Sequence, residues 1–79
     1  MANYEYAEGT VISYAIIPPG TFAVTVRVPY KGGTIKQKYE FEYASFVRLD
    51  VREGTRVSLR MNMDLPYLLR QWQFVKFIL

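Results

Sequence analysis

Cysteine and histidine, two residue types that carry much of enzyme chemistry, are missing from this chain. Without histidine, the commonest general base and metal ligand is absent. Without cysteine, disulfides, thiol nucleophiles and the usual zinc sites are excluded. Ser13, Ser45 and Ser58 have no histidine to activate them, and none lies in a G-x-S-x-G motif. We therefore expect a protein that is not an enzyme and holds neither a metal nor a cofactor.

Long apolar runs and targeting signals are also missing. No stretch approaches the roughly 20 apolar residues that span a bilayer. The first residues, MANYEYAEGT, lack the basic and apolar regions of a signal peptide. Gly32-Gly33 belongs to no phosphate-binding glycine motif. These absences predict a soluble cytoplasmic protein without a membrane partner.

What the chain does contain is a rich supply of apolar and basic side chains. Of its 79 residues, 51% are hydrophobic and 16% aromatic, which predicts one folded domain over residues 1–79. A chain of this size buries only about 60% of its unfolded surface, so self-association is a plausible aid to stability. The net charge of +3 and the pI near 9.3 agree with a nucleic-acid partner.

Alternating apolar and polar residues predict two neighbouring strands. In Thr21–Tyr30 the apolar side chains stand at even positions, and in Thr34–Tyr43 they stand at odd positions. Gly32-Gly33 lies between these runs and suits a two-residue hairpin turn, because a positive φ costs glycine little. We therefore predict a β-hairpin over residues 21–43.

The register of this hairpin follows from the position of the turn. With Gly32-Gly33 as the turn, Tyr30 lies opposite Ile35 and Arg27 lies opposite Lys38. A slip of one residue would turn the apolar side chains of one strand to solvent. On the polar face the cations gather near the turn. That face is either a solvated surface with incidental charge or an anion-binding patch.

Three further strands and a short connection complete the chain. Thr10–Ile17 is apolar on both sides and ends at Pro18-Pro19-Gly20. Residues 44–50 lose the alternation and predict at most one helical turn. Alternation returns in Thr55–Met63, and a closing strand is expected over Gln71–Ile78, with a short helix over Tyr67–Gln71 as an option.

Five short strands in this order predict an all-β fold, a small closed or nearly closed barrel without exposed sheet edges. The order is similar to that of the OB-fold, in which a helix sits between the third and fourth strands. An SH3-like barrel is the alternative. The stretch VREGTRVSLRM, residues 51–61, is similar to the turn-and-strand entry seen in many domains of both kinds.

The leading functional hypothesis is a barrel that binds single-stranded DNA or RNA with little sequence preference. Such proteins combine a basic groove for phosphates with aromatic faces on which bases stack. The resemblance to the OB-fold implies binding around its second and third strands. The expected phosphate contacts are Arg27, Lys31, Lys36, Lys38, Arg56 and Arg60. The expected stacking residues are Tyr30, Tyr14 and Trp72.

A protein-interaction or oligomerisation module is the alternative hypothesis. The predicted strand Thr10–Ile17 and the C-terminal QWQFVKFIL are apolar on both sides. Together they offer more hydrophobic surface than one small barrel can bury, and such surface usually marks an interface. The C-terminal strand could also add to a neighbouring sheet. On this hypothesis the partner is a protein or a second copy of the chain.

Overall fold

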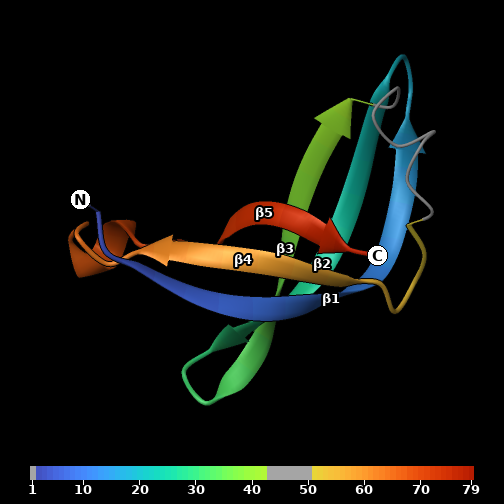
Figure 1. The fold of residues 1–79 in the computed structure, drawn as a ribbon. Helices are drawn as coiled ribbons and strands as arrows, with labels where there is room; N and C mark the ends of the chain where they lie inside the picture. The colour runs from blue at the N-terminus through green and yellow to red at the C-terminus, as the bar shows by residue number, and fades with distance from the viewer. Residues whose placement is uncertain (1, 43–50) are drawn as a thin grey trace.

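A computed structural model describes residues 2–42 and 51–79, which form one sheet of five antiparallel strands (Figure 1). The predicted all-β fold is confirmed. The elements are β1 (Tyr4–Ile17), β2 (Thr21–Tyr30), β3 (Gly33–Glu42), β4 (Arg56–Asn62), the 3-10 helix η1 (Tyr67–Leu69) and β5 (Gln73–Ile78). The helical turn expected near 44–50 lies outside the described residues.

The strand β1 organises the sheet, whose order is β3-β2-β1-β4-β5. The first part of β1 pairs with β4 and its second part pairs with β2. The register of β1 against β2 shifts between Val11 and Ser13, where β1 carries a bulge. Because bulges bend a strand, the sheet turns into two arms that meet at the middle of β1 (Figure 1).

The sheet is open in its backbone pairing. It ends at β3 on one side and at β5 on the other. The two edges approach each other through side chains, since the Phe41 ring on β3 lies 4.7 Å from the Phe74 ring and 5.7 Å from the Phe77 ring on β5. The described residues therefore form an open sheet, and the closed or nearly closed barrel expected from the sequence stays a prediction.

The hairpin of β2 and β3 forms as predicted, but its register differs by two residues. Tyr30 lies opposite Gly33 rather than Ile35, and Arg27 lies opposite Lys36 rather than Lys38. A shift of two residues keeps every side chain on its face, because strand side chains alternate with a period of two. The predicted faces are therefore confirmed, whereas the predicted pairing across them is wrong.

The reason for the difference is the turn itself. Lys31 and Gly32 have φ values of 44° and 80°, and a type I′ turn needs positive φ at both central residues. The turn is thus Lys31-Gly32 and not Gly32-Gly33. The left-handed conformation of Lys31, which is uncommon for a residue with a Cβ, leaves Gly33 free to pair with Tyr30.

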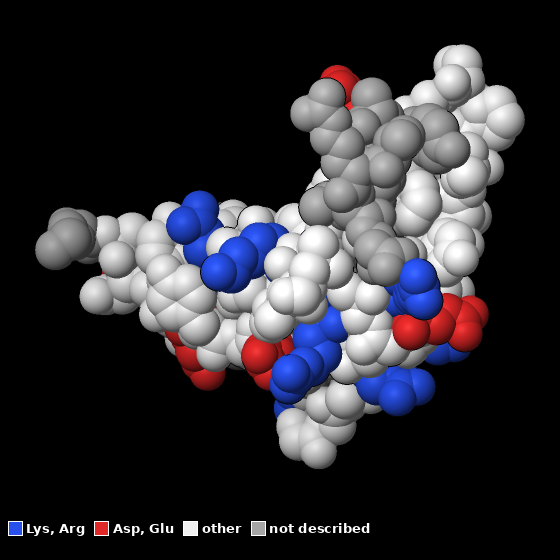
Figure 2. Space-filling model, turned by 45° about the vertical axis from the view of Figure 1, so that its right-hand side comes forward, with Lys and Arg blue, Asp and Glu red and all other residues white. Residues whose placement is uncertain are grey.

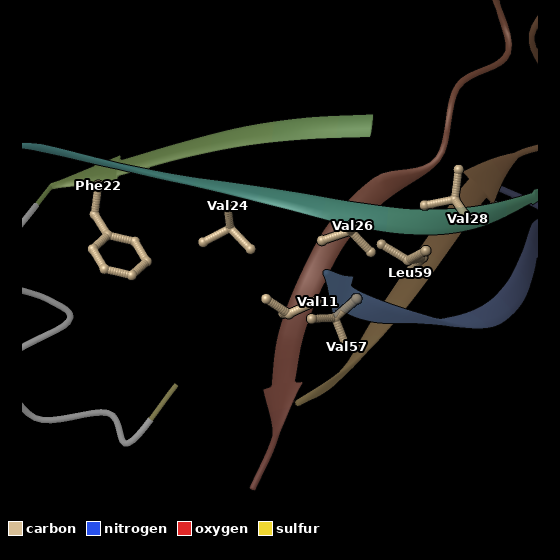
Figure 3. Packing of buried hydrophobic residues seen from close by; sticks show 7 residues of the cluster. All are labelled: Val11, Phe22, Val24, Val26, Val28, Val57 and Leu59. Carbon is tan, nitrogen blue, oxygen red and sulfur yellow. The ribbon is translucent and has the colours of Figure 1, made fainter. Parts of the chain in front are cut away.

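The core lies in the bend of the sheet. Figure 3 shows its side chains converging from β1, β2 and β4, and all of them are buried: Val11, Phe22, Val24, Val26, Val28, Val57 and Leu59. The even positions of β2 and the odd positions of β4 are the ones expected from alternation. Tyr39, Phe41, Phe74 and Phe77 pack against this cluster from the two edge strands.

Gly9 lies where β1 packs tightly against β2 and β4. A Cβ at this position would lie 2.6 Å from Val26 Cγ1, 2.8 Å from the carbonyl oxygen of Arg27 and 3.1 Å from Leu59 Cδ1. The space that a side chain would occupy is already filled by β2 and β4. Only glycine lets the two arms of the sheet pack this closely.

Candidate functional site

Three cations form a row on the face of the sheet that lies away from the core. Side chains directly opposite each other on paired strands point to the same side. Lys36 lies opposite Arg27, Arg27 opposite Thr10, and Thr10 opposite Arg56. Arg27 follows the buried Val26, so the row faces outward. We call Lys36, Arg27 and Arg56 the basic row.

The basic row keeps most of its positive charge. Arg27 and Lys36 lie directly opposite each other, an arrangement of like charges that costs about 0.2–1 kcal/mol. Among the described residues neither of them forms an ion pair. Arg56 approaches Glu8 with 3.7 Å between Nη1 and Oε2, but both side chains are well exposed, so the pair contributes little.

Further cations border the basic row on the same face. Lys38 lies opposite Thr25 on β2, and Lys76 lies opposite Ser58 on β4. Figure 2 shows one side of the whole molecule, on which Lys and Arg side chains spread over the left and lower parts with Asp and Glu between them. The arm formed by the end of β1 and the start of β2 shows no Lys or Arg in this view.

Two tyrosines that the sequence analysis did not select share this outer face. Tyr6 lies opposite Arg60 and Tyr4 opposite Asn62, and the Tyr6 side chain is 64% exposed. The Arg60 guanidinium lies 4.4 Å from the centre of the Tyr4 ring, a cation–π contact. The Tyr-Glu-Tyr alternation at residues 4–6 could have revealed them, because it extends the first strand upstream of Thr10.

The aromatic residues selected from the sequence lie elsewhere. Tyr14 lies opposite Val24 on the core side of the sheet, with its ring stacked on Phe22 at 5.6 Å. Tyr30 stands at the end of β2 and is 49% exposed. Trp72 directly precedes β5 and is partly buried against the core. The structure therefore places five of the selected cations on the outer face, away from these three rings: Arg27, Lys36, Lys38, Arg56 and Arg60. The sixth, Lys31, lies at the turn beside the Tyr30 ring.

A cleft of about 600 Å³ lies between the β2–β3 turn and the chain between β4 and β5. We call it the turn cleft. Its rim carries the exposed side chains of Tyr30 and Lys31 from the hairpin and of Tyr67 from η1, and Trp72 also lines it. The Lys31 ammonium lies 5.2 Å from the centre of the Tyr30 ring. Tyr30, through a side-chain hydrogen bond, and Tyr67 raise the pKa of Lys31.

Two hydrogen bonds hold the walls of the turn cleft in place. The Trp72 indole N–H donates to the carbonyl oxygen of Pro29 at 2.8 Å. The Tyr39 hydroxyl donates to the carbonyl oxygen of Trp72 at 2.7 Å. Burial raises the pKa of Tyr39 to about 12, so the phenol stays protonated and remains a donor at neutral pH. These bonds tie the segment before β5 to both strands of the hairpin.

Arg70 shapes the same segment and is not a free cation. Its Nε donates to the carbonyl oxygen of Leu65 at 2.9 Å, and its Nη2 donates to that of Met63 at 3.0 Å. These bonds satisfy carbonyl groups where the chain leaves β4 and enters η1. Arg70 therefore holds the wall of the cleft.

Two further features are absent from the part of the chain that the structure describes. Among residues 2–42 and 51–79, no three His, Cys, Asp or Glu side chains form a cluster that could hold a metal ion. In the same part of the chain no helix has the length and apolar character needed to cross a membrane.

Comparison of the chain with protein-family models, with curated proteins and with solved structures finds no match. Its own residues are thus the guide to its function.

Proposed function

We propose that this protein binds single-stranded nucleic acid through the outer face of its sheet, without catalysing a reaction. The observation that carries the proposal is the basic row, in which Arg27 and Lys36 face each other across two strands. This pairing is unfavourable for folding. A polyanion bound across the row would offset the repulsion between the cations, because each cation would gain a phosphate partner.

The fold supports this proposal. The strand order β3-β2-β1-β4-β5 agrees with an OB-like barrel that is open between β3 and β5. The Phe41 ring on β3 and the Phe74 and Phe77 rings on β5 span this gap. We propose that the chain is such an opened OB-like barrel. Barrels of this kind bind oligonucleotides on the face around their second and third strands, and β2 and β3 carry Arg27, Lys36 and Lys38.

Phosphate contact and base stacking have separate residues on the outer face. The basic row, with Lys38 and Arg60 beside it, contacts phosphates without reading sequence. Tyr6 presents an exposed ring beside Arg60 on which an unpaired base can stack. Every base has a flat face, so binding of DNA or RNA with little sequence preference is expected.

The direct test is a salt titration of oligonucleotide binding. Fluorescence anisotropy of a labelled oligo-dT should show binding at micromolar protein and low salt. With about four phosphates contacted and about −0.7 per contact, the slope of log affinity against log salt should be near −3. Unlabelled oligo-dA and oligo-U should compete similarly. No anisotropy change at low salt would exclude the proposal.

A second candidate function is self-association, which is favoured by the uncharged arm formed by the end of β1 and the start of β2. No charged residue occurs from Val11 to Val26, yet Tyr14, Ile16 and Ile17 are exposed there, Ile16 to 55%. Interfaces between identical subunits are depleted in charge and rich in apolar side chains. We expect a second copy of the chain to cover this arm.

Light scattering over a range of concentrations tests this second candidate. A mass approaching twice 9.2 kDa at high concentration is expected for the unmodified chain. Ile16→Asp should keep the mass at that of one chain, because a charge cannot be buried in an apolar interface without a partner. A single-chain mass for both proteins at high concentration would rule self-association out.

A further inference from the structure

We infer that the turn cleft is a site for one unpaired nucleobase, separate from the phosphate-binding outer face. The inference rests on the proposed function, which it deepens by naming where a base is held. Tyr67, a residue of η1 that no pattern in the sequence selected, is assigned as its principal stacking ring.

The rim of the turn cleft presents aromatic faces to solvent. Tyr67 is 65% exposed and Tyr30 is 49% exposed, although the two belong to segments far apart in the chain. Both tyrosines raise the pKa of Lys31, which lies in the turn after Tyr30. Exposed rings with a cation beside them are the arrangement on which unpaired bases stack, since each base offers a π-face and carries a phosphate nearby.

The other polar groups that line the cleft suit a base better than a phosphate. Glu5, Gln37 and Gln71 line it together with apolar side chains such as Met61. A carboxylate repels phosphate but accepts hydrogen bonds from the amino and imino groups of bases. Side-chain amides both donate and accept, as the Watson–Crick edge of an unpaired base requires. Two cations line the cleft. Arg70 is bonded to backbone carbonyl groups, which leaves Lys31, at the turn, where a phosphate attached to that base would lie.

The cleft is formed before any ligand arrives. The Trp72 indole bond to Pro29, the Tyr39 bond to the Trp72 carbonyl group and the two Arg70 bonds fix both walls. A site that is already ordered loses little conformational entropy on binding. Its volume of about 600 Å³ lies within the range of about 300–1,000 Å³ found for small-molecule pockets, enough for a base and its sugar.

The β2–β3 hairpin connects the cleft to the basic row. Arg27 and Lys36 lie on its outer face, and Lys31 lies at its end. A strand that crosses the row can therefore continue to the hairpin end and turn one base into the cleft.

Trp72 is the only tryptophan in the chain and lines the cleft, so its fluorescence reports directly on an occupying base. We would compare oligo-dT of about eight nucleotides, within the 4–16 nucleotides bound per OB fold, with an abasic oligonucleotide of the same length. Oligo-dT should quench Trp72 fluorescence. The abasic strand should bind with a similar salt slope, more weakly and without quenching.

Variants of Tyr67 complete the experiment. Tyr67→Ala should weaken oligo-dT binding about five- to 150-fold, the range for loss of one stacked base, with the salt slope unchanged. Tyr67→Phe keeps the ring and should bind like the unmodified protein. Both variants should keep the thermal unfolding midpoint of the parent, since Tyr67 is largely exposed.

Two results would overturn the inference, and they are distinguishable. If both oligonucleotides bind equally, without quenching, and Tyr67→Ala has no effect, the cleft is not a base site while the proposed function stands. If neither oligonucleotide binds at low salt, the cleft site and the proposed function fail together.

Discussion

Replacing Lys36, Arg27 and Arg56 together with glutamine is expected to weaken oligo-dT binding about 100-fold at low salt. Glutamine keeps a long polar side chain but removes the charge. Three exposed ionic contacts, at up to about 1 kcal/mol each, correspond to about this factor, since 1.4 kcal/mol is tenfold. The slope of log affinity against log salt should become shallower by about 2, because each of the three lost contacts contributes about −0.7.

Charge and fold can be separated in this experiment. Arg27→Lys keeps the charge and should leave the salt slope unchanged. The triple variant should unfold at the same or a slightly higher denaturant concentration than its parent, because it removes the unfavourable pairing of Arg27 with Lys36. A slope that stays near −3 in the folded triple variant would place the phosphate contacts elsewhere on the molecule.

Replacing Gly9 with alanine should lower the free energy of unfolding by about 1–3 kcal/mol, the usual cost of overfilling a packed core. The added Cβ would meet Val26 Cγ1 at 2.6 Å and the carbonyl oxygen of Arg27 at 2.8 Å. A side chain can rotate away, but the backbone oxygen cannot move without disturbing the pairing of β1 with β2. Small domains have only about 5–15 kcal/mol of stability, so urea unfolding should show the change clearly.

Gly20 supplies the matched control for this substitution. A Cβ at Gly20 would meet nothing within 4 Å, so Gly20→Ala should be neutral or slightly stabilising through its effect on the unfolded chain. The double variant Gly9→Ala/Val26→Ala should lose less stability than the sum of the losses of the two single variants, because the clash with Val26 is removed. Part of the loss from Gly9→Ala should persist, because the carbonyl oxygen of Arg27 remains in place. Equal unfolding midpoints for Gly9→Ala and Gly20→Ala would show that β1 does not pack as closely as described.

The elements were predictable to different degrees along the chain. The strand expected at Thr55–Met63 appears as Arg56–Asn62, and the closing strand starts at Gln73 instead of Gln71. Strand β1 begins at Tyr4, six residues before the expected Thr10. Its first part was missed because the alternation there is inverted: Glu5 takes the core side of the sheet, whereas Tyr4 and Tyr6 take the outer face.

The hairpin shows why local pattern stops short of register. Turns at Lys31-Gly32 and at Gly32-Gly33 produce the same two faces, since they differ by a shift of two residues. The turn at Lys31-Gly32 requires a positive φ at Lys31. The additional pairing of Gly33 with Tyr30 favours this turn. The alternation of apolar and polar residues therefore does not determine whether Arg27 pairs with Lys36 or with Lys38.

The candidate site was predictable in its residues more than in its geometry. The cations of the basic row lie on the outer face of β2, β3 and β4, as alternation predicted, and their role in binding stays a prediction. The turn cleft was not foreseen, because its walls come from the hairpin and from residues 63–72, which are separated by β3, β4 and the intervening chain. Tyr67 carries no local pattern that distinguishes it from the six other tyrosines.

By itself, the sequence determined the class of the fold and the side of the sheet that most side chains of β2, β3 and β4 take. Both follow from local alternation, because burying one face of a strand imposes a period of two. Only the tertiary structure decided that Thr10 brings Arg27 and Arg56 into one line, and that Trp72 joins β5 to the hairpin. Those contacts depend on pairings between distant strands, whose free energies have no counterpart in any short stretch of residues.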